Sequence, residues 1–172
     1  MLGNEISSLL TESDANQGIL GDGQIGQAVG RLARGFGMSI ETYGRENTPT
    51  DLAALFSRSD FVSIHLPLTP ETKGMVDRSL LTQMKATSFL INLARGGVVN
   101  QADLVDALTK GTLAGAALDV LDVEPPLDPN HPLLKFGQVV ATPHIGFNTR
   151  EAVAEKGEIA LANIAAYCAE HP

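Results

Sequence analysis

Residues 18–26 read Gly-Ile-Leu-Gly-Asp-Gly-Gln-Ile-Gly, so that a short apolar run leads into the spacing G-x-G-x-x-G. A strand, this spacing and then a helix are typical of a loop that binds the pyrophosphate of a dinucleotide. In such a loop Gly21 permits the tight turn, Gly23 lets the backbone approach the phosphates, and Gly26 lets the helix pack closely on the strand.

The helix that begins after this turn is a second reason to expect a phosphate. The backbone N–H groups of Gln24 and Ile25 lie at its amino end, where free donors and the helix dipole favour an anion. The alternative is a turn that only requires a positive φ. We favour phosphate binding because strands and helices continue to alternate downstream. Asp22 is unusual here, since a carboxylate beside a pyrophosphate repels it unless the side chain points away.

Apolar strand-like runs and helical patterns alternate along the rest of the chain. The runs predict strands at residues 18–20, 38–43, 61–64, 88–93, 113–120 and 139–141. The periodicity predicts helices at 24–36, 51–57, 77–84, 101–110 and 149–169, with Ile25, Val29, Leu32 and Phe36 on one face of the first and Gly111 ending the fourth. This alternation predicts an α/β fold with a doubly wound, mostly parallel sheet in three αβα layers. Residues 1–17 are expected to be a helix or a disordered lead-in, with 14–17 as a linker, and 18–172 to be the domain.

The composition narrows the classes of function. The 172 residues are 44% hydrophobic and 19% charged, as in a globular domain. The net charge is −8 and no Lys/Arg run occurs, so we expect no nucleic-acid partner. No signal peptide is recognisable and no run approaches the ~20 apolar residues of a membrane span, so we expect no membrane partner. The single cysteine, Cys168, allows no intrachain disulfide and fits a reducing cytoplasm, and no His/Cys cluster indicates a metal.

Three polar residues far apart in the chain each follow a strand-like run. They are Arg95 in Asn-Leu-Ala-Arg-Gly-Gly, Glu124 in Asp-Val-Glu-Pro-Pro, and His144 in Thr-Pro-His-Ile-Gly. The carboxyl ends of parallel strands share one edge of the sheet, where ligands bind. An anion clamp, a pKa-tuning carboxylate and a proton carrier at that edge suit proton-coupled chemistry on an acidic substrate. Taken singly, Arg95 could form a surface ion pair, Glu124 could be a loop acid, and His144 could be an ordinary hydrogen-bonded histidine.

The glycine loop and these three motifs together resemble the nucleotide-binding domain of the D-isomer-specific 2-hydroxyacid dehydrogenases, over about residues 18–167. The resemblance implies a Rossmann-type fold and hydride transfer between C2 of a 2-hydroxy or 2-oxo acid and a nicotinamide. It implies that Arg95 orients the 2-oxo acid and polarises its carbonyl. It also implies that His144 is the general acid in reduction and the general base in oxidation, with its pKa raised by Glu124.

Further cofactor contacts follow from the same resemblance. Leu66 and Pro67 are expected near the adenine, and Thr72 at a phosphate. Asp119 is expected to bond to the carboxamide, although an Asp there could equally cap a turn. The remaining expected contacts, beside the nicotinamide, are Leu93, Ala94 and Gly146. His65 is expected to be a structural hydrogen-bonding residue.

The choice between NADP and NAD depends on the end of the second strand. NAD-preferring domains place an acid there, about 20 residues after the loop. The matching position here is Gly44, followed by Arg45, and the loss of an acid beside a new cation favours the 2′-phosphate of NADP. The alternative is that Arg45 is a solvated loop residue and that Glu46 binds the ribose.

The family's substrate domain has no counterpart in this sequence. We therefore expect a truncated or split dehydrogenase that is a poor catalyst, or inactive, alone, because cleft closure excludes water and fixes the reacting geometry. The resemblance implies a homodimer built on nucleotide-domain surfaces. The alternative function is a non-catalytic dinucleotide-binding or dimerisation module. The sequence does not name the 2-hydroxy acid.

Overall fold

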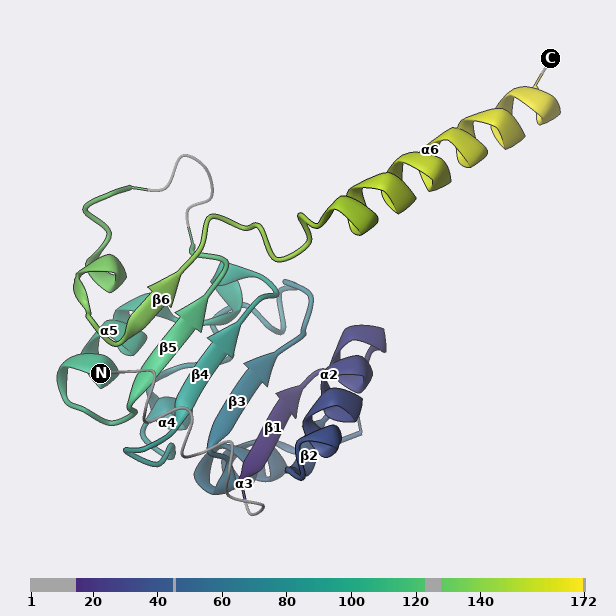
Figure 1. Ribbon diagram of the computed structural model, residues 1–172. Coiled ribbons are helices and arrows are strands. Elements are labelled where there is room, and N and C mark those ends of the chain that lie inside the picture. The colour runs from purple at the N-terminus through teal and green to yellow at the C-terminus, as the bar shows by residue number, and fades with distance from the viewer. Residues whose placement is uncertain (1–14, 45, 123–127, 172) are drawn as a thin grey trace.

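A computed structural model describes residues 15–44, 46–122 and 128–171 of the chain (Figure 1). Six strands form one sheet, and every neighbouring pair is parallel. The strands are β1 (Asn16–Leu20), β2 (Ser39–Tyr43), β3 (Phe61–Ile64), β4 (Phe89–Asn92), β5 (Gly115–Leu118) and β6 (Val139–Ala141). This confirms the α/β fold with a parallel, Rossmann-type sheet.

The order of the strands locates the ligand edge. Across the sheet they run β2-β1-β3-β4-β5-β6, so the chain moves outward from β1 to β2 and then returns to the other side of β1. The direction reverses between β1 and β3, and a crevice opens beyond the carboxyl ends of strands at such a switch point. The glycine loop, which directly follows β1, therefore lies at the ligand edge.

Helices cover the two faces of the sheet unequally. The helices are α2 (Gln24–Gly35), α3 (Pro49–Arg58), α4 (Arg78–Leu81), α5 (Gln101–Thr109) and α6 (Arg150–Glu170), with short 3₁₀ turns η1 (Gly96–Val98) and η2 (Pro132–Lys135). The helices α3, α4 and α5 pack side by side on one face, whereas α2 packs mainly on β1 and β2 from the other. Successive side chains of β1 show this division, because Leu20 joins the core under α3–α5 while Ile19 lies against Gly30 of α2.

The helix α3 illustrates how local sequence and packing agree. Thr48 caps its first turn by accepting the backbone N–H of Asp51, and the carboxylate of Asp51 accepts the backbone N–H of Thr48 in return. Leu52, Leu55 and Phe56 then recur at helical spacing and are buried. The capping fixes where the helix begins, and the apolar stripe fixes which side faces the sheet.

The apolar face predicted for the first helix is not the face that packs on the sheet. Ile25, Leu32 and Phe36 are 65–69% exposed, although α2 itself forms as predicted. Small residues face the sheet instead: Gly26, Gly30 and Ala33 are buried. Short side chains let the helix axis approach β1 closely, so the large apolar side chains lie on the outer surface.

Two predicted boundaries are corrected by the structure. Asn16 and Gln17, expected in a linker, are the first residues of β1 and pair with β2, and the preceding Ala15 is buried. The helix expected over 77–84 shortens to α4, where Asp77 caps the start by accepting the N–H groups of Ser79 and Leu80. The other predicted elements form with ends shifted by a few residues, and β3 and β6 have the predicted bounds.

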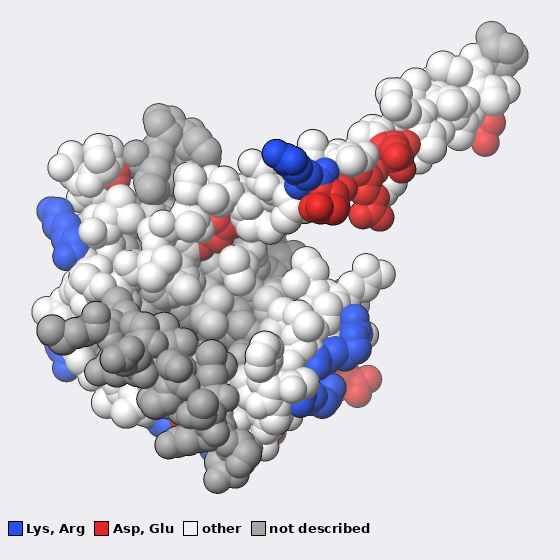
Figure 2. Space-filling view, viewed as in Figure 1, with Lys and Arg blue, Asp and Glu red and all other residues white. Residues whose placement is uncertain are grey.

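The last helix, α6, extends away from the sheet (Figure 1). None of its 21 residues is buried, and Ile159, Leu161, Ile164 and Tyr167 are each at least 55% exposed. Acidic side chains gather on its first half (Figure 2). Over the described ranges, no helix is both long and apolar enough to cross a bilayer.

Candidate functional site

The loop after β1 has the geometry that its glycines predict. Gly21 has φ +108°, and a β-carbon on it would lie 2.7 Å from the carbonyl oxygen of His65, at the end of β3. A β-carbon on Gly26 would overlap the carbonyl oxygen of Gly21. Both positions therefore exclude a side chain, because the backbone of the turn lies close to the end of β3 at Gly21 and to α2 at Gly26.

The amino end of α2 is left open to a ligand. Gly23 is its N-cap and provides no side chain to cap the helix, and a β-carbon on Gly23 would meet no atom within 4 Å. The amide of Gln27 donates to the backbone oxygen of Asp22 at 2.9 Å and holds the loop against the helix. The N–H groups of Gln24 and Ile25 thus stand at a positive helix end beside free space, as a phosphate requires.

A cleft of about 750 Å³ lies along the carboxyl edge of the sheet beside this loop. The predicted site residues that line it are Ile25, Leu66, Pro67, Leu93, Ala94, Arg95, Asp119, His144 and Gly146. Three other lining residues were not predicted as site residues: Val29, His65 and Phe147. Segments from five parts of the chain thus meet at one edge, and the cleft brings Arg95 and His144 together.

Arg95 is placed by a turn that Asn92 holds. Asn92, at the end of β4, is 1% exposed; its side-chain amide donates to the oxygen of Arg95 at 3.0 Å, and its side-chain oxygen accepts the N–H of Ala94 at 3.0 Å. A β-carbon on Gly96 would overlap the backbone of Leu121, so the turn also packs tightly on the segment after β5. The guanidinium of Arg95 is exposed at the cleft and donates to the oxygen of Ala94 at 2.6 Å.

His144 is held in an unusual backbone conformation by Asp119. Its φ is +55°, which non-glycine residues seldom adopt and which occurs often at functional sites. The carboxylate of Asp119 accepts the hydroxyl of Thr142 and the N–H groups of Ile145 (2.9 Å) and Gly146 (2.8 Å), and its backbone oxygen accepts the N–H of His144 at 2.8 Å. Asp119 therefore does cap a turn, the alternative that the sequence left open.

These hydrogen bonds keep Asp119 ionised although it is only 4% exposed. Burial acts to raise its pKa, but the hydroxyl of Thr142, the two backbone N–H groups and the nearby His144 together lower the pKa below its ordinary value. A negative charge thus lies at the base of the turn that carries His144.

One aromatic ring packs against His144, and His65, which lines the same cleft, has a separate hydrogen-bond partner. The ring of Phe147 packs edge-on to His144 with centroids 5.9 Å apart, and Nζ of Lys156 lies 5.4 Å from the Phe147 centroid. His65 shares a 3.1 Å hydrogen bond with Ser63, and burial lowers the pKa of His65. His65 thus has the structural hydrogen bond that was expected.

The remaining predicted residues lie beside the cleft or outside the described ranges. The hydroxyl of Thr72 donates to the oxygen of Pro67 at 2.6 Å and closes the loop after β3. Gly44 follows β2 directly. Arg45 and Glu124 fall outside the described residues. The carboxylate of Asp122, just before Glu124, lies 3.5 Å from Nε2 of His131.

Comparison with known proteins agrees with this geometry. The family model for the D-isomer specific 2-hydroxyacid dehydrogenase, NAD binding domain, matches residues 6–146. The chain is 45% identical to the glyoxylate reductase of Thermofilum pendens over an alignment of 160 positions, which covers 87% of this chain and 47% of that protein. The chain spans about half the length of this and two other curated relatives.

Two solved structures share the fold with different cofactors in their names. The NAD complexed form of a D-isomer specific 2-hydroxyacid dehydrogenase from Lactobacillus delbrueckii ssp. bulgaricus superposes with a TM-score of 0.82 at 29% identity, over 92% of this chain and 54% of that one. An NADPH-dependent glyoxylate/hydroxypyruvate reductase from Sinorhizobium meliloti superposes with a TM-score of 0.70 at 30% identity, over 76% and 72%. NAD and NADP therefore both fit the fold. The chain belongs to the D-isomer specific 2-hydroxyacid dehydrogenase family, whose NAD binding domain it carries.

Proposed function

We propose that this chain is the dinucleotide-binding half of an oxidoreductase that interconverts a small 2-hydroxy acid and its 2-oxo acid. The observation that carries the proposal is the shared cleft, in which Arg95 and His144 lie beside the open amino end of α2. The glycine loop would hold the pyrophosphate, and a bound nicotinamide would supply or accept the hydride at C2. Residues 16–172 would act as one dinucleotide-binding domain, two residues longer at its start than the 18–172 expected from sequence.

The side chains have distinct roles in this proposal. Arg95 binds the substrate carboxylate through two parallel hydrogen bonds, which a planar guanidinium provides and an ammonium does not. His144 protonates the carbonyl oxygen during reduction and accepts the proton in the reverse direction. Glu124 is proposed as its carboxylate partner. Leu93, Ala94 and Gly146 would border the nicotinamide, with Leu66, Pro67 and Thr72 toward the adenosine and phosphates.

The proposal predicts weak catalysis when these 172 residues, which span about half the length of the relatives, are assayed by themselves. Nothing then covers the cleft, so water enters it and the reacting groups are less well positioned. The second candidate function is a dinucleotide-binding or dimerisation module without catalysis. One observation favours this candidate. Asp119 was expected to bond to the nicotinamide carboxamide, but both of its carboxylate oxygens already accept hydrogen bonds from the 142–146 turn.

Turnover and binding measured on the same protein separate the two functions. The purified chain is incubated with NADH or NADPH and a panel of 2-oxo acids, and both cofactor binding and 2-oxo-acid-dependent oxidation are measured. Turnover that is lost in His144→Asn and in Arg95→Lys, but kept in His171→Asn at the exposed end of α6, supports the dehydrogenase. Binding without turnover contradicts it and supports the module.

We also propose self-association into a homodimer. The outer face of α2 and the whole of α6 expose large apolar side chains, and such surfaces favour association. A family-type two-fold contact and a non-specific apolar contact both produce association, but only the first stops at two copies. A cytoplasmic location is our inference from the single cysteine, Cys168.

A further inference from the structure

The end of β2 is where dinucleotide folds usually present an acid, and here that end has no side chain. Gly44 directly follows the last residue of β2, Tyr43. The N–H of Gly21 donates to the oxygen of Tyr43 at 2.9 Å, which brings the glycine loop beside this strand end. The residue next to Gly21 in the loop is Asp22, so its side chain can reach the space that Gly44 leaves empty.

The carboxylate of Asp22 occupies that space. A β-carbon built on Gly44 would lie 2.6 Å from Oδ2 of Asp22 and 2.8 Å from its Cγ. A side chain at position 44 and the present orientation of Asp22 therefore exclude one another. In this chain an acidic group is present at the strand end, but it comes from the loop instead of from the strand.

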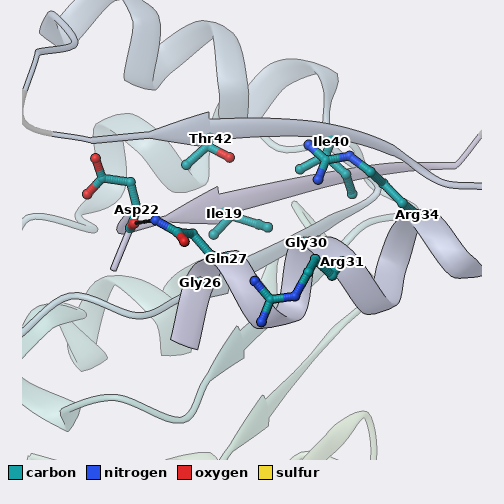
Figure 3. A pocket seen from close by; sticks show the side chains of 9 residues that line it. All are labelled: Ile19, Asp22, Gly26, Gln27, Gly30, Arg31, Arg34, Ile40 and Thr42. Atoms are coloured by element: carbon teal, nitrogen blue, oxygen red, sulfur yellow. Dashed lines mark hydrogen bonds between the residues drawn. The ribbon is translucent and has the colours of Figure 1, made fainter. Parts of the chain in front are cut away.

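Neighbouring contacts hold both partners in place. Gln27 fixes the backbone of Asp22 through the 2.9 Å hydrogen bond to its oxygen, and the N–H of Gly44 donates to the side chain of Asn47 at 2.7 Å. Asp22 also lines a pocket of about 230 Å³ between α2 and β2 (Figure 3). Its side chain points away from α2 past the end of β2, whereas Arg34 lies by Ile40, nearer the other end of the strand.

We propose that Asp22 accepts the hydroxyl groups of the adenosine ribose and makes this domain select NAD over NADP. A carboxylate at the end of the second strand performs this role in NAD-binding domains, and a 2′-phosphate at the same position would meet a like charge. The proposal rests on the proposed dinucleotide binding and refines it. It reverses the preference for NADP that Gly44 and Arg45 suggested from sequence, because the missing acid is replaced in space by a residue 22 positions earlier.

The test measures dissociation constants of the full chain for NAD, NADP and 2′-deoxy-NAD by calorimetry. We expect NAD to bind at least about tenfold more tightly than NADP, because a hydrogen bond to a charged group is typically worth that much. Asp22→Asn should weaken NAD binding by about tenfold or more and reduce the preference for NAD over NADP. It should weaken the binding of 2′-deoxy-NAD less than that of NAD, because this analogue keeps only the 3′-hydroxyl of the two groups that Asp22 is proposed to bind.

A relocation variant separates this role from a structural one. Asp22→Gly should lose NAD affinity, and Gly44→Asp added to it should restore most of that loss by moving the acid onto the strand. Glu41→Gln removes one negative charge from the same strand, where Glu41 pairs with Arg58 at 2.6 Å, and should leave the preference unchanged. The role of Asp22 is overturned if NADP binds as tightly as NAD, or if Asp22→Asn leaves the NAD affinity unchanged. Either result leaves the proposed dinucleotide binding intact. Failure of every dinucleotide to bind overturns the proposed function as well.

Discussion

The carboxylate of Asp119 accepts the backbone N–H of Gly146 at 2.8 Å, across 27 positions of sequence. This bond joins the end of β5 to the turn that follows β6 and contains His144. A β-carbon on Gly146 would lie 2.9 Å from Oδ2 of the same carboxylate, so the contact also requires glycine. The geometry of the cleft at His144 therefore depends on a buried charge that the chemistry itself need not use.

Replacement of Asp119 by Asn should destabilise the protein in a pH-dependent way. The folded-state pKa of Asp119 is lowered, so its contribution is present above the unfolded pKa of about 3.9 and is lost as the pH falls through the folded value. Asp119→Asn should lower the free energy of unfolding by about 1–3 kcal/mol at pH 7. When the free energy of unfolding is measured in urea, the difference between parent and variant should become smaller below about pH 4. Glu158→Gln, on the exposed α6, is the control, and a gap that does not change with pH contradicts the prediction.

Replacement of Gly26 by Ala should damage both stability and dinucleotide binding. The new β-carbon would overlap the backbone oxygen of Gly21, and the loop or α2 would have to move. We expect a loss of about 1–3 kcal/mol in the free energy of unfolding, with weaker NAD binding. Gly35→Ala, in the last turn of the same helix, would meet no atom within 4 Å and should be neutral or slightly stabilising. Equal effects of the two variants would refute the close contact.

The ring of His65 should titrate below the ordinary histidine pKa of about 6.5. Burial lowers its pKa, so its contribution to stability is present above about pH 6.5 and is lost as the pH falls through the folded value. NMR titration of the ring measures this pKa directly. His65→Gln, which retains a partner for Ser63, should reduce the loss of stability between about pH 7 and pH 5. A ring pKa at or above 6.5 would show that burial does not control it.

Self-association should depend on the outer face of α2. Leu32 and Phe36 are 67% and 65% exposed, and their burial in a dimer would favour association by about tenfold or more for each residue. Sedimentation velocity over a concentration series should show a dimer for the parent and a shift to monomer for the double variant Leu32→Gln, Phe36→Gln. The matched variant Leu161→Gln, Ile164→Gln tests α6 in the same way. A parent that stays monomeric at high concentration excludes the dimer, and growth beyond two copies indicates non-specific contact.

Local signals in the sequence predicted the elements well. The bounds of β3 and β6 agree with their apolar runs, and Gly111, with φ +66°, follows α5 as expected for the end of a helix. Periodicity found α2 but could not show which of its faces meets the sheet, because Gly26 and Gly30 carry no hydrophobic signal. The linker prediction failed at Asn16 and Gln17, since polar residues enter β1 when a neighbouring strand pairs with them.

The site was predictable as a set of motifs but not as a set of contacts. Arg95 and His144 reach one cleft because the ends of parallel strands share an edge, which the alternation of elements implies. The role of Asn92 in holding the turn could have been predicted from sequence, because its hydrogen-bond partners lie two and three residues away along the chain. The sequence allowed a turn-capping Asp119 but could not name its partners at residues 142–146, and it did not place Asp22 beside Gly44, because these groups are brought together only by the register of the sheet. Phe147 directly follows the Thr-Pro-His-Ile-Gly motif, but an apolar ring carries no chemical group that would mark it as a site residue.

Because α6 extends away from the sheet, it should unfold locally without the rest of the domain. A helix of 21 residues, ~31 Å long, gains little from its own hydrogen bonds in water unless another surface covers it. Its backbone amides should therefore exchange with deuterium through local fraying. The amides of β1 and β3 should exchange much more slowly, because their exchange requires unfolding of the whole sheet. Any surface that covers Ile159 and Ile164 would slow that exchange along the whole helix, so the protection of α6 reports directly on whether its partner is present.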